Sequence, residues 1–435
     1  MNVVVVGLGK IGLPLAVQYA RSGARVTGLD VADRVVESVN TAQEPFPGET
    51  GLAEALLEVV PDGRLRATTD PADAIPDADV VVVVVPLFVD ADGVPDFGWM
   101  DDATDTIGAH LRPGTLVAYE TTLPVGTTRG RWAPRLEARS GLVEGRDFHV
   151  VFSPERVLTG RVFADLRRYP KLVGGLTDRG SALGRSFYET VLQFDERADL
   201  GRPNGVWDLK TAEAAELAKL AETTYRDVNI ALANEFARFA ERQSIDIEAV
   251  IEACNSQPYS HIHRPGIAVG GHCIPVYPRL YLWNDPEATV VRAARARNAA
   301  MPSHAVELLA RLHGDLRGQH AVVLGAAYRG GVKETAFSGV FDTVRALAER
   351  GAIVTVTDPL YSDEELRALG LDPHVPGAPV DAAVVQADHA EYASWDQSRL
   401  PGVRSVVDGR RVLDAARWTS ATVAAIGAPP TAAVD

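Results

Sequence analysis

The N-terminal segment of the chain constrains its fold more than any other segment. From Asn2 to Val31 it reads NVVVVGLGKIGLPLAVQYARSGARVTGLDV, which is typical of a strand, a glycine turn, a helix and a second strand. The apolar run before the first glycine is unbroken, as in a parallel strand that is covered on both faces. Such a unit predicts an α/β domain with a doubly wound sheet.

Apolar runs of the same kind recur along the chain. The first α/β pattern continues to about residue 200 through the segments DADVVVVVVP, GTLVAYETT and DFHVVFSPE. A second pattern comprises QHAVVLGAAYRGGVKET, GAIVTVTDPL, DAAVVQADHAEY and VRSVVDGRRVLD. The strand that ends at Leu324 and the glycine turn after it repeat the arrangement at the N-terminus. We therefore predict two Rossmann-like doubly wound domains.

The segment between the two patterns has helical periodicity. From Thr211 to Gln243 apolar residues recur at three- and four-residue spacing, and neither glycine nor proline interrupts them. This pattern predicts one long helix in a central helical domain that joins the two Rossmann-like domains. A helix of this length usually packs against more than its own domain, so we expect it to form the interface of a homodimer.

Charge and cysteine content exclude several classes of protein. The net charge of −15 argues against nucleic acid, because binding to nucleic acid depends on Lys and Arg side chains that neutralise phosphates. Two cysteines cannot form a disulfide framework, and they suit a reducing, cytoplasmic compartment. The N-terminal apolar run lacks the basic flank of a signal peptide. The longest apolar run, Val80 to Pro86, is far shorter than the roughly 20 residues that cross a bilayer.

The glycine turn after the first strand predicts a dinucleotide site. Gly7, Gly9 and Gly12 form the pattern G-x-G-x-x-G, in which glycine permits a tight turn, close approach of a pyrophosphate and close packing of helix on strand. Asp30 ends the second strand, where a carboxylate binds the 2′-hydroxyl of a ribose and repels a 2′-phosphate. These residues favour NAD over NADP. The alternative is a glycine turn that binds no ligand.

A second candidate site is the stretch GGHCIPVYP, from Gly270 to Pro278. Cys273 follows two glycines, whose lack of a Cβ atom lets a ligand approach the backbone. A thiolate is a strong nucleophile, and a nearby cation favours its formation. The alternative is a loop cysteine without a chemical role, whereas Cys254 suits a structural position inside a helix.

Several motifs together resemble one family over nearly the whole chain. They are GLGKIGLPLA, ETTLPVGTT, FSPERVLTG, AELAKLAETTYRDVNIALANE, GGHCIPV and VTVTDP. The chain resembles the UDP-glucose/GDP-mannose dehydrogenase family, nearest to its UDP-N-acetylmannosamine/N-acetylglucosamine 6-dehydrogenase branch. This resemblance implies an NAD-binding domain, a central helical domain and a UDP-sugar-binding domain. We place them at residues 1–204, 205–300 and 301–435.

The resemblance also implies a reaction. Members of this family oxidise the C6 hydroxyl of a nucleotide sugar to a carboxylate in two hydride transfers to NAD⁺. Cys273 matches the nucleophile that forms a thiohemiacetal and then a thioester, Lys219 the cation beside it, and Glu155 the general base. The remaining matched positions on the cofactor side are Ile11, Arg34 and Thr122. Those on the substrate side are Arg156, Val157, Thr223, Arg226, Gly270, Tyr328 and Arg329.

Each matched residue also has an ordinary structural interpretation. An isolated lysine or arginine on a helix is usually solvated, and Thr122 or Tyr328 would be unremarkable as a packing residue. A metal site finds little support: His261, His263 and His272 are close in sequence, but no set of carboxylates or cysteines completes a zinc pattern.

Other positions depart from the family pattern. Tyr277 replaces an aspartate and stays neutral at pH 7, so it cannot act as a carboxylate base. Thr223 replaces an asparagine and offers one hydroxyl donor in place of an amide. The further departures are Leu87 for a threonine, Arg329 for a lysine, Ala336 for an arginine, and Gln257 and Tyr259 where an arginine is expected.

These departures leave two alternatives to the full two-step oxidation, and the first domain considered alone leaves a third. The chain could perform a single oxidation or a conversion through a transient carbonyl. It could be a binder of nucleotide sugars without catalysis. A simpler two-domain hydroxyacid dehydrogenase would explain the first domain but leave Cys273 and the second Rossmann-like domain without a role.

Overall fold

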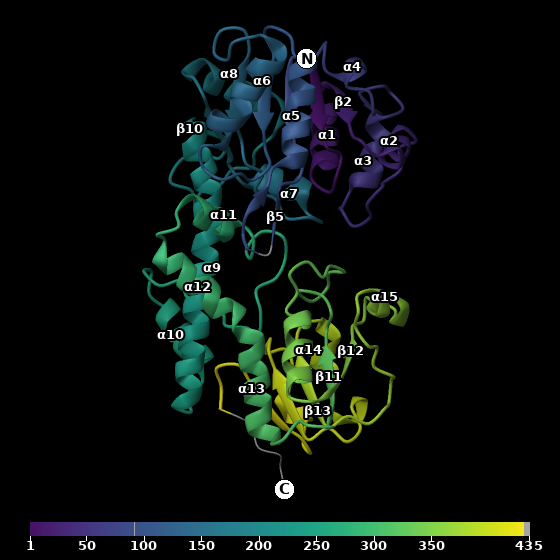
Figure 1. The fold of residues 1–435 in the computed structure, drawn as a ribbon, viewed down its shortest axis with the longest axis vertical. Helices are drawn as coiled ribbons and strands as arrows, with labels where there is room; N and C mark the ends of the chain where they lie inside the picture. The colour runs from purple at the N-terminus through teal and green to yellow at the C-terminus, as the bar shows by residue number, and fades with distance from the viewer. Residues whose placement is uncertain (91, 430–435) are drawn as a thin grey trace. The chain divides into compact units, whose positions relative to one another are not determined.

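A computed structural model describes residues 1–90 and 92–429 of the chain. These residues form two compact units, one of residues 1–222 and one that begins at Thr223. The long helix predicted between Thr211 and Gln243 is present as α9 (Ala212–Arg242), and both units contain part of it. The two units are described separately below (Figure 1).

The first unit is built on an eight-stranded sheet with the order β10-β9-β8-β7-β4-β1-β2-β3. The strands are β1 (Asn2–Val6), β2 (Arg25–Leu29), β3 (Leu65–Thr68), β4 (Val80–Val83), β7 (Leu116–Tyr119), β8 (His149–Phe152), β9 (Lys171–Gly175) and β10 (Val206–Thr211). Neighbouring strands are parallel except for β8 and β9. A short antiparallel pair, β5 (Phe88–Val89) and β6 (Pro95–Asp96), lies outside this sheet.

Helices cover both faces of this sheet (Figure 1). They are α1 (Gly12–Arg21), α2 (Asp33–Asn40), α3 (Leu52–Val59), α4 (Pro71–Ala74), α5 (Gly98–His110), α6 (Ala133–Ser140), α7 (Val162–Arg168) and α8 (Asp178–Val191). Val3 and Val5 belong to the apolar core formed with α1 and α8, and Val4 and Val6 to the core formed with α5 and α6. Successive side chains of a strand point to opposite faces, so an unbroken valine run supplies both cores.

The second unit contains a five-stranded parallel sheet with the order β12-β11-β13-β14-β15. Its strands are β11 (His320–Leu324), β12 (Ile353–Thr357), β13 (Ala382–Val385), β14 (Ser405–Asp408) and β15 (Thr422–Ala425). Its helices after α9 are α10 (Ile247–Asn255), α11 (Tyr277–Asn284), α12 (Thr289–Ala299), α13 (Met301–His313), α14 (Val340–Glu349) and α15 (Asp363–Ala368). Leu309 of α13 and Leu347 of α14 pack with Val323 on one face of the sheet, and Trp418 packs with Val322 on the other. The predicted α/β class with two Rossmann-like domains is confirmed.

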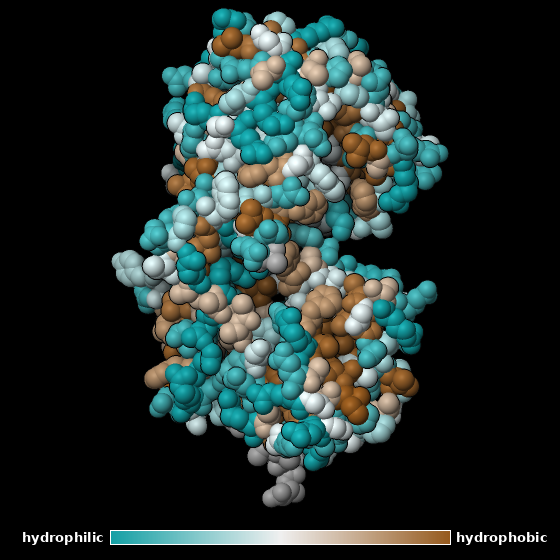
Figure 2. Space-filling model, in the orientation of Figure 1, coloured by the Kyte–Doolittle hydropathy of each residue, from teal (hydrophilic) through white to brown (hydrophobic). Residues whose placement is uncertain are grey.

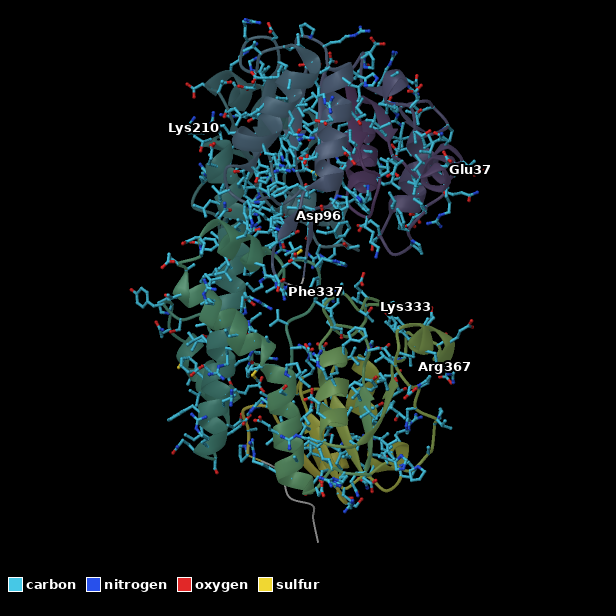
Figure 3. The ribbon with its side chains drawn as sticks, in the orientation of Figure 1. Glu37, Asp96, Lys210, Lys333, Phe337 and Arg367 are labelled. Atoms are coloured by element: carbon cyan, nitrogen blue, oxygen red, sulfur yellow. The ribbon has the colours of Figure 1, made fainter. Side chains whose placement is uncertain are left out.

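The surface is mostly polar. Charged side chains such as Glu37, Lys210 and Arg367 project outward (Figure 3). Apolar side chains gather over α14 and β12 (Figure 2), where Ile353 of the edge strand is 49% exposed. Among the described residues, no helix is long and apolar enough to cross a membrane.

Candidate active site

The glycine turn between β1 and α1 has the geometry that a dinucleotide requires. Gly7 has φ +90°, and its N–H donates to the carbonyl oxygen of Leu29 at 2.8 Å. A Cβ atom on Gly12 would lie 1.8 Å from the carbonyl oxygen of Gly7, so only glycine fits there. A Cβ atom on Gly9 would meet no atom within 4 Å, which leaves the approach to the backbone open. This open side can accept a pyrophosphate at the start of α1.

Asp30 is held at the same turn. Its Oδ2 accepts from the N–H of Leu8 at 2.7 Å, and its Oδ1 accepts from the N–H of Ala32 at 2.9 Å. A carboxylate has about four lone-pair sites, so both oxygens can still accept hydrogen bonds from ribose hydroxyls. Ile11 directly precedes α1, and Arg34 is exposed in the first turn of α2. These residues fit NAD.

The loop after β7 carries Thr122, whose side chain is buried. Glu216 of α9 holds this loop: its carboxylate accepts from the N–H of Gly126 at 2.5 Å and from the hydroxyl of Thr128 at 2.6 Å. Burial raises the pKa of Glu216 to about 7. Leu87, which replaces a threonine of the family pattern, packs against the apolar core to which α5 contributes Met100 and Ile107.

The expected catalytic and substrate residues of the first unit lie in a chain of alternating charges. Lys171 Nζ donates to Glu120 Oε2 at 2.7 Å and to Glu155 Oε2 at 2.8 Å. The next residue, Arg156, donates through Nε to Glu222 Oε2 at 2.9 Å. Lys219 Nζ donates to Glu222 Oε1 at 3.3 Å. The order of charges is Glu120, Lys171, Glu155, Arg156, Glu222, Lys219, and Glu155 is joined to Arg156 through the backbone N–H of Arg156.

The structure brings Lys219 of α9 together with Glu155 and Arg156, which precede it by more than 60 residues. Sequence reasoning missed the other members of the chain of charges: Glu120, Lys171 and Glu222. One signal was available, because Lys171 begins an apolar strand pattern, where a charged side chain must be buried and paired. Val157 follows Arg156 and is partly buried against the α1 core.

Burial and charge act in opposite directions on Lys171, whose side chain is 4% exposed. Burial alone would lower its pKa, but the carboxylates of Glu120 and Glu155 raise it above the usual value. Lys171 is therefore an ammonium ion at neutral pH, and its positive charge lies beside both carboxylates.

In the second unit, Cys273 lies on the turn that leads into α11, and it is exposed. Its carbonyl oxygen accepts from the N–H groups of Val276 at 3.2 Å and Tyr277 at 2.9 Å. Tyr277 is the first residue of α11. His272 pairs with Glu334 at 3.3 Å, which ties the cysteine turn to the loop after β11.

The glycines before Cys273 pack against Tyr328. A Cβ atom on Gly270 would lie 2.5 Å from the Cβ atom of Tyr328, and Gly271 has φ +88° with the Tyr328 ring beside it. The N–H of Gly271 donates to the carbonyl oxygen of Ala336 at 2.8 Å. Two of the expected substrate residues, Gly270 and Tyr328, thus touch.

Tyr328 belongs to the loop of residues 325–339, which also carries Lys333 and Phe337 (Figure 3). Arg329 Nε donates to the hydroxyl oxygen of Tyr328 at 3.1 Å. Arg410 Nη2 donates to the carbonyl oxygen of Tyr328 at 3.1 Å, a contact that sequence reasoning missed.

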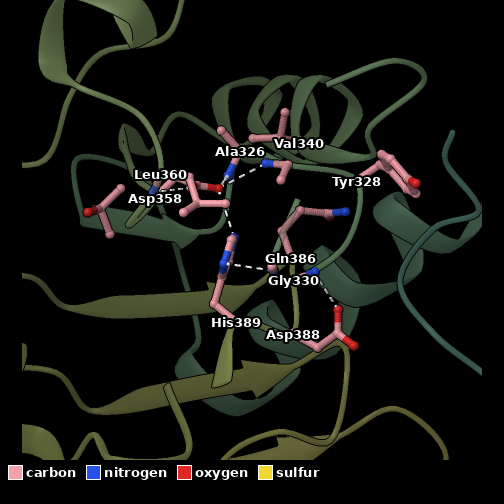
Figure 4. Close-up of polar contacts among 12 residues, drawn as sticks. Ala326, Tyr328, Gly330, Val340, Asp358, Leu360, Gln386, Asp388 and His389 are labelled. Atoms are coloured by element: carbon pink, nitrogen blue, oxygen red, sulfur yellow. Dashed lines mark hydrogen bonds and ion pairs between the residues drawn. The ribbon is translucent and has the colours of Figure 1, made fainter. Parts of the chain in front are cut away.

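A polar cluster anchors the base of this loop (Figure 4). Asp358 Oδ2 accepts from the N–H groups of Ala326 at 2.8 Å and Ala327 at 3.0 Å, and it contacts His389 Nε2 at 3.1 Å. Asp388 Oδ1 accepts from the N–H of Gly330 at 2.7 Å. The loop that presents Tyr328 is therefore fixed at its base by the buried Asp358 and His389 and by the more exposed Asp388.

The remaining expected residues lie elsewhere in the second unit. Thr223 is buried and Arg226 is exposed, both on α9. Gln257 and Tyr259 lie on the loop after α10, where Tyr259 is 93% exposed. Within residues 1–90 and 92–429, no group of three or more His, Cys, Asp or Glu side chains could hold a metal ion.

A dinucleotide turn on one sheet, a second Rossmann-like sheet and a cysteine beside a fixed loop define an NAD-dependent oxidoreductase with a second nucleotide-binding domain. Residues 1–192 match the NAD binding domain of the UDP-glucose/GDP-mannose dehydrogenase family, residues 213–300 its central domain and residues 322–415 its UDP binding domain. The chain belongs to this family, as its motifs predicted.

Individual relatives agree with this assignment. The chain is 34% identical over 421 residues to a UDP-N-acetyl-D-mannosamine dehydrogenase of Pyrococcus horikoshii, with 95% of this chain and 96% of the relative covered. It is 31% identical over 426 residues to an NDP-N-acetyl-D-galactosaminuronic acid dehydrogenase of Ralstonia solanacearum, with 95% and 96% covered. The solved structure of the Pyrococcus horikoshii UDP-D-ManNAc dehydrogenase is similar, with a TM-score of 0.87, 32% identity, and 98% of this chain and 99% of that chain covered.

Proposed function

We propose that this NAD-dependent UDP-sugar dehydrogenase oxidises the C6 hydroxyl of a UDP-N-acetylhexosamine to a carboxylate in two steps through Cys273. The observation that carries the proposal is the chain of charges, which collects Glu155, Arg156 and Lys219 on the dinucleotide-binding unit. The substrate class is inferred from relatives named for UDP-N-acetyl-D-mannosamine.

NAD⁺ supplies the hydride acceptor in both oxidations. The Cys273 thiolate adds to the carbon of the C6 aldehyde and forms a C–S bond, which gives a thiohemiacetal. Oxidation of this adduct gives a thioester, and attack by water breaks the C–S bond and releases the carboxylate and the thiol. The exposed position of Cys273 lets a sugar approach the sulfur.

Two side chains of the first unit have roles in this scheme. Glu155 accepts the proton of the water that attacks the thioester. The Lys219 ammonium stabilises the oxyanion that forms when sulfur or water adds to the carbonyl carbon. The Glu222 carboxylate sets the position of both Lys219 and Arg156, because it accepts hydrogen bonds from both side chains.

A second candidate function is a single oxidation that stops at the aldehyde. The observation that favours it is Tyr277, a neutral phenol at the start of α11 where the family pattern has an acid. Thr223, which replaces an asparagine, lacks the amide donor of that residue and therefore also favours a single oxidation.

We further propose a homodimer that forms through α9. The exposed apolar side chains of this helix include Tyr225 (56%), Leu232 (42%), Phe236 (38%) and Phe239 (55%). Their spacing of seven, four and three residues places them on one face of the helix. The small number of cysteines supports a cytoplasmic location. The proposed domains comprise residues 1–204, 205–300 and 301–435.

The test is a panel of UDP-sugars with NAD⁺ in which NADH and product masses are measured. We expect an acid and about two NADH per sugar with one member of the panel. Cys273→Ser should lower acid formation at least about 100-fold, while Cys254→Ser in α10 serves as the matched control and keeps activity. Aldehyde as the final product would support the single oxidation, and no NADH with any sugar would contradict both proposals.

A further inference from the structure

The carboxylate of Glu155 is held on both oxygens by donors of the first unit. Its Oε1 accepts from the N–H of Arg156 at 2.7 Å, and its Oε2 accepts from Lys171 Nζ at 2.8 Å. The side chain is 11% exposed, so water reaches only part of it. A general base needs a defined direction as well as a charge, and these two contacts set its direction.

Lys171 is the side chain that brings charge to this carboxylate. It begins β9, and its ammonium also donates to Glu120 at 2.7 Å and lies 4.7 Å from the centre of the Tyr188 ring. A buried ammonium ion is stable only when carboxylates and hydrogen bonds compensate for lost hydration. Lys171 therefore cannot turn toward solvent without leaving Glu120 and Glu155 uncompensated.

Glu120 fixes Lys171 from the opposite side. Its Oε1 accepts from the hydroxyls of Tyr188 at 2.7 Å and Tyr19 at 3.1 Å. These tyrosines belong to α8 and α1, which pack on the same face of the sheet. The position of Lys171 is thus determined by two helices and two strand ends.

We propose that Lys171 is a positioning residue for the reaction: held by Glu120 and packed against Tyr188, it places a positive charge against Glu155 and keeps that carboxylate aimed for proton transfer. This inference rests on the proposed function, because it assigns Glu155 the role of general base. Lys171 acts only through Glu155 and is not itself a catalytic residue.

The other charged and titratable groups around Glu155 do not replace this cation. They come from α1, the end of β7, the loop after β8, α7, the segment before β9 and α8, and are Tyr19, Glu120, Arg156, Asp165, Tyr169 and Tyr188. Among them Arg156 alone is a cation, and its guanidinium donates to Glu222 and to the carbonyl oxygen of Pro170. Loss of Lys171 would leave the largely buried Glu155 carboxylate without its cation, which favours protonation of a carboxylate.

The experiment compares pH profiles of kcat/KM and kcat. Lys171→Met alone would leave the buried Glu120 carboxylate without its cation, so the informative variant is Lys171→Met combined with Glu120→Gln, which keeps an acceptor for both tyrosines. We expect its acidic limb to move up by about one to three pH units. The value of kcat should fall at least about tenfold, with a smaller change in KM. Lys171→Arg should keep the acidic limb close to its wild-type position, because arginine retains the positive charge. Lys210→Met, at an exposed position of β10, is the matched lysine control.

A second measurement reads the same property without turnover. The infrared carboxylate band that disappears in Glu155→Gln is titrated with pH in the wild type and in the double variant, and its midpoint should rise by at least about one unit. A midpoint and an acidic limb that stay within about 0.3 unit of the wild type would overturn the inference. Absence of NADH from the wild type with every UDP-sugar would instead contradict the proposed function, while the infrared titration would still decide the role of Lys171.

Discussion

The glycine turns of the two units have the same backbone geometry, but the aspartates beside them have different environments. Gly7 has φ +90° and donates to Leu29 at 2.8 Å, and Gly325 has φ +101° and donates to Thr357 at 2.7 Å. In both units an aspartate directly follows the second strand and accepts from backbone N–H groups of the turn. Both sheets thus begin with the same supersecondary unit.

The difference lies in what else each carboxylate contacts. Asp30 is partly exposed and keeps lone pairs for a ribose. Asp358 is 5% exposed and is held by His389 as well as by Ala326 and Ala327. Burial opposes its ionisation, but the hydrogen bonds from His389 and from the backbone prevail and lower its pKa. The second turn therefore has a structural role: its aspartate fixes the base of the loop that carries Tyr328.

The largest effect is expected where a side chain would meet backbone. Gly12→Ala places a Cβ atom 1.8 Å from the carbonyl oxygen of Gly7, and we expect a loss of more than about 5 kcal/mol in the free energy of unfolding of the first unit. Gly9→Ala meets no atom within 4 Å and should keep the fold while it weakens NAD binding. Urea unfolding and calorimetric titration with NAD⁺ check both. A folded Gly12→Ala protein with normal NAD affinity would contradict this account of the turn.

The two aspartates should respond differently to the same substitution. Asp358→Asn leaves a buried N–H group or His389 without an acceptor, and we expect a loss of about 3–5 kcal/mol in stability. Asp30→Asn should cost about 1–2 kcal/mol in stability and lower NAD affinity about tenfold. Chemical unfolding and NAD titration of both variants make the comparison. Equal stability losses would show that the two carboxylates have the same role.

A smaller effect concerns the pH dependence of stability. The pKa of Glu216 is about 7 in the folded protein, so the folded state binds more protons than the unfolded state between about pH 4.5 and 7. Stability from this group is complete below that window and falls by up to about 3 kcal/mol as the pH rises through it.

Glu216→Gln should lack this pH-dependent loss, because an amide does not titrate. Urea unfolding at pH 5 and pH 8 measures the difference between wild type and variant. Asp358, with its lowered pKa, has the opposite sign: its contribution is complete above about pH 3.9 and is lost as the pH falls below it. Parallel pH profiles for wild type and Glu216→Gln would contradict the assignment to Glu216.

Much of the fold could be predicted from local pattern. The valine runs of β1 and β4, the glycine turn at Gly7 and the uninterrupted periodicity of α9 each depend on residues that are neighbours in sequence. The antiparallel pairing of β8 with β9 was not predicted, because strand direction depends on how the chain returns to the sheet. Residues of the candidate site were found through motif resemblance, and their roles are still predictions.

The sequence by itself determined which segments become strands and helices and where a dinucleotide turn lies, because those features follow from hydrophobic period and from the absence of a Cβ atom. Only the tertiary structure decided which charges pair. Lys171, Glu120 and Glu155 come from the ends of three strands, and Asp358 meets His389 across 31 residues. Such pairs depend on distances in space, and burial makes them obligatory because an uncompensated charge in a core is too costly to keep.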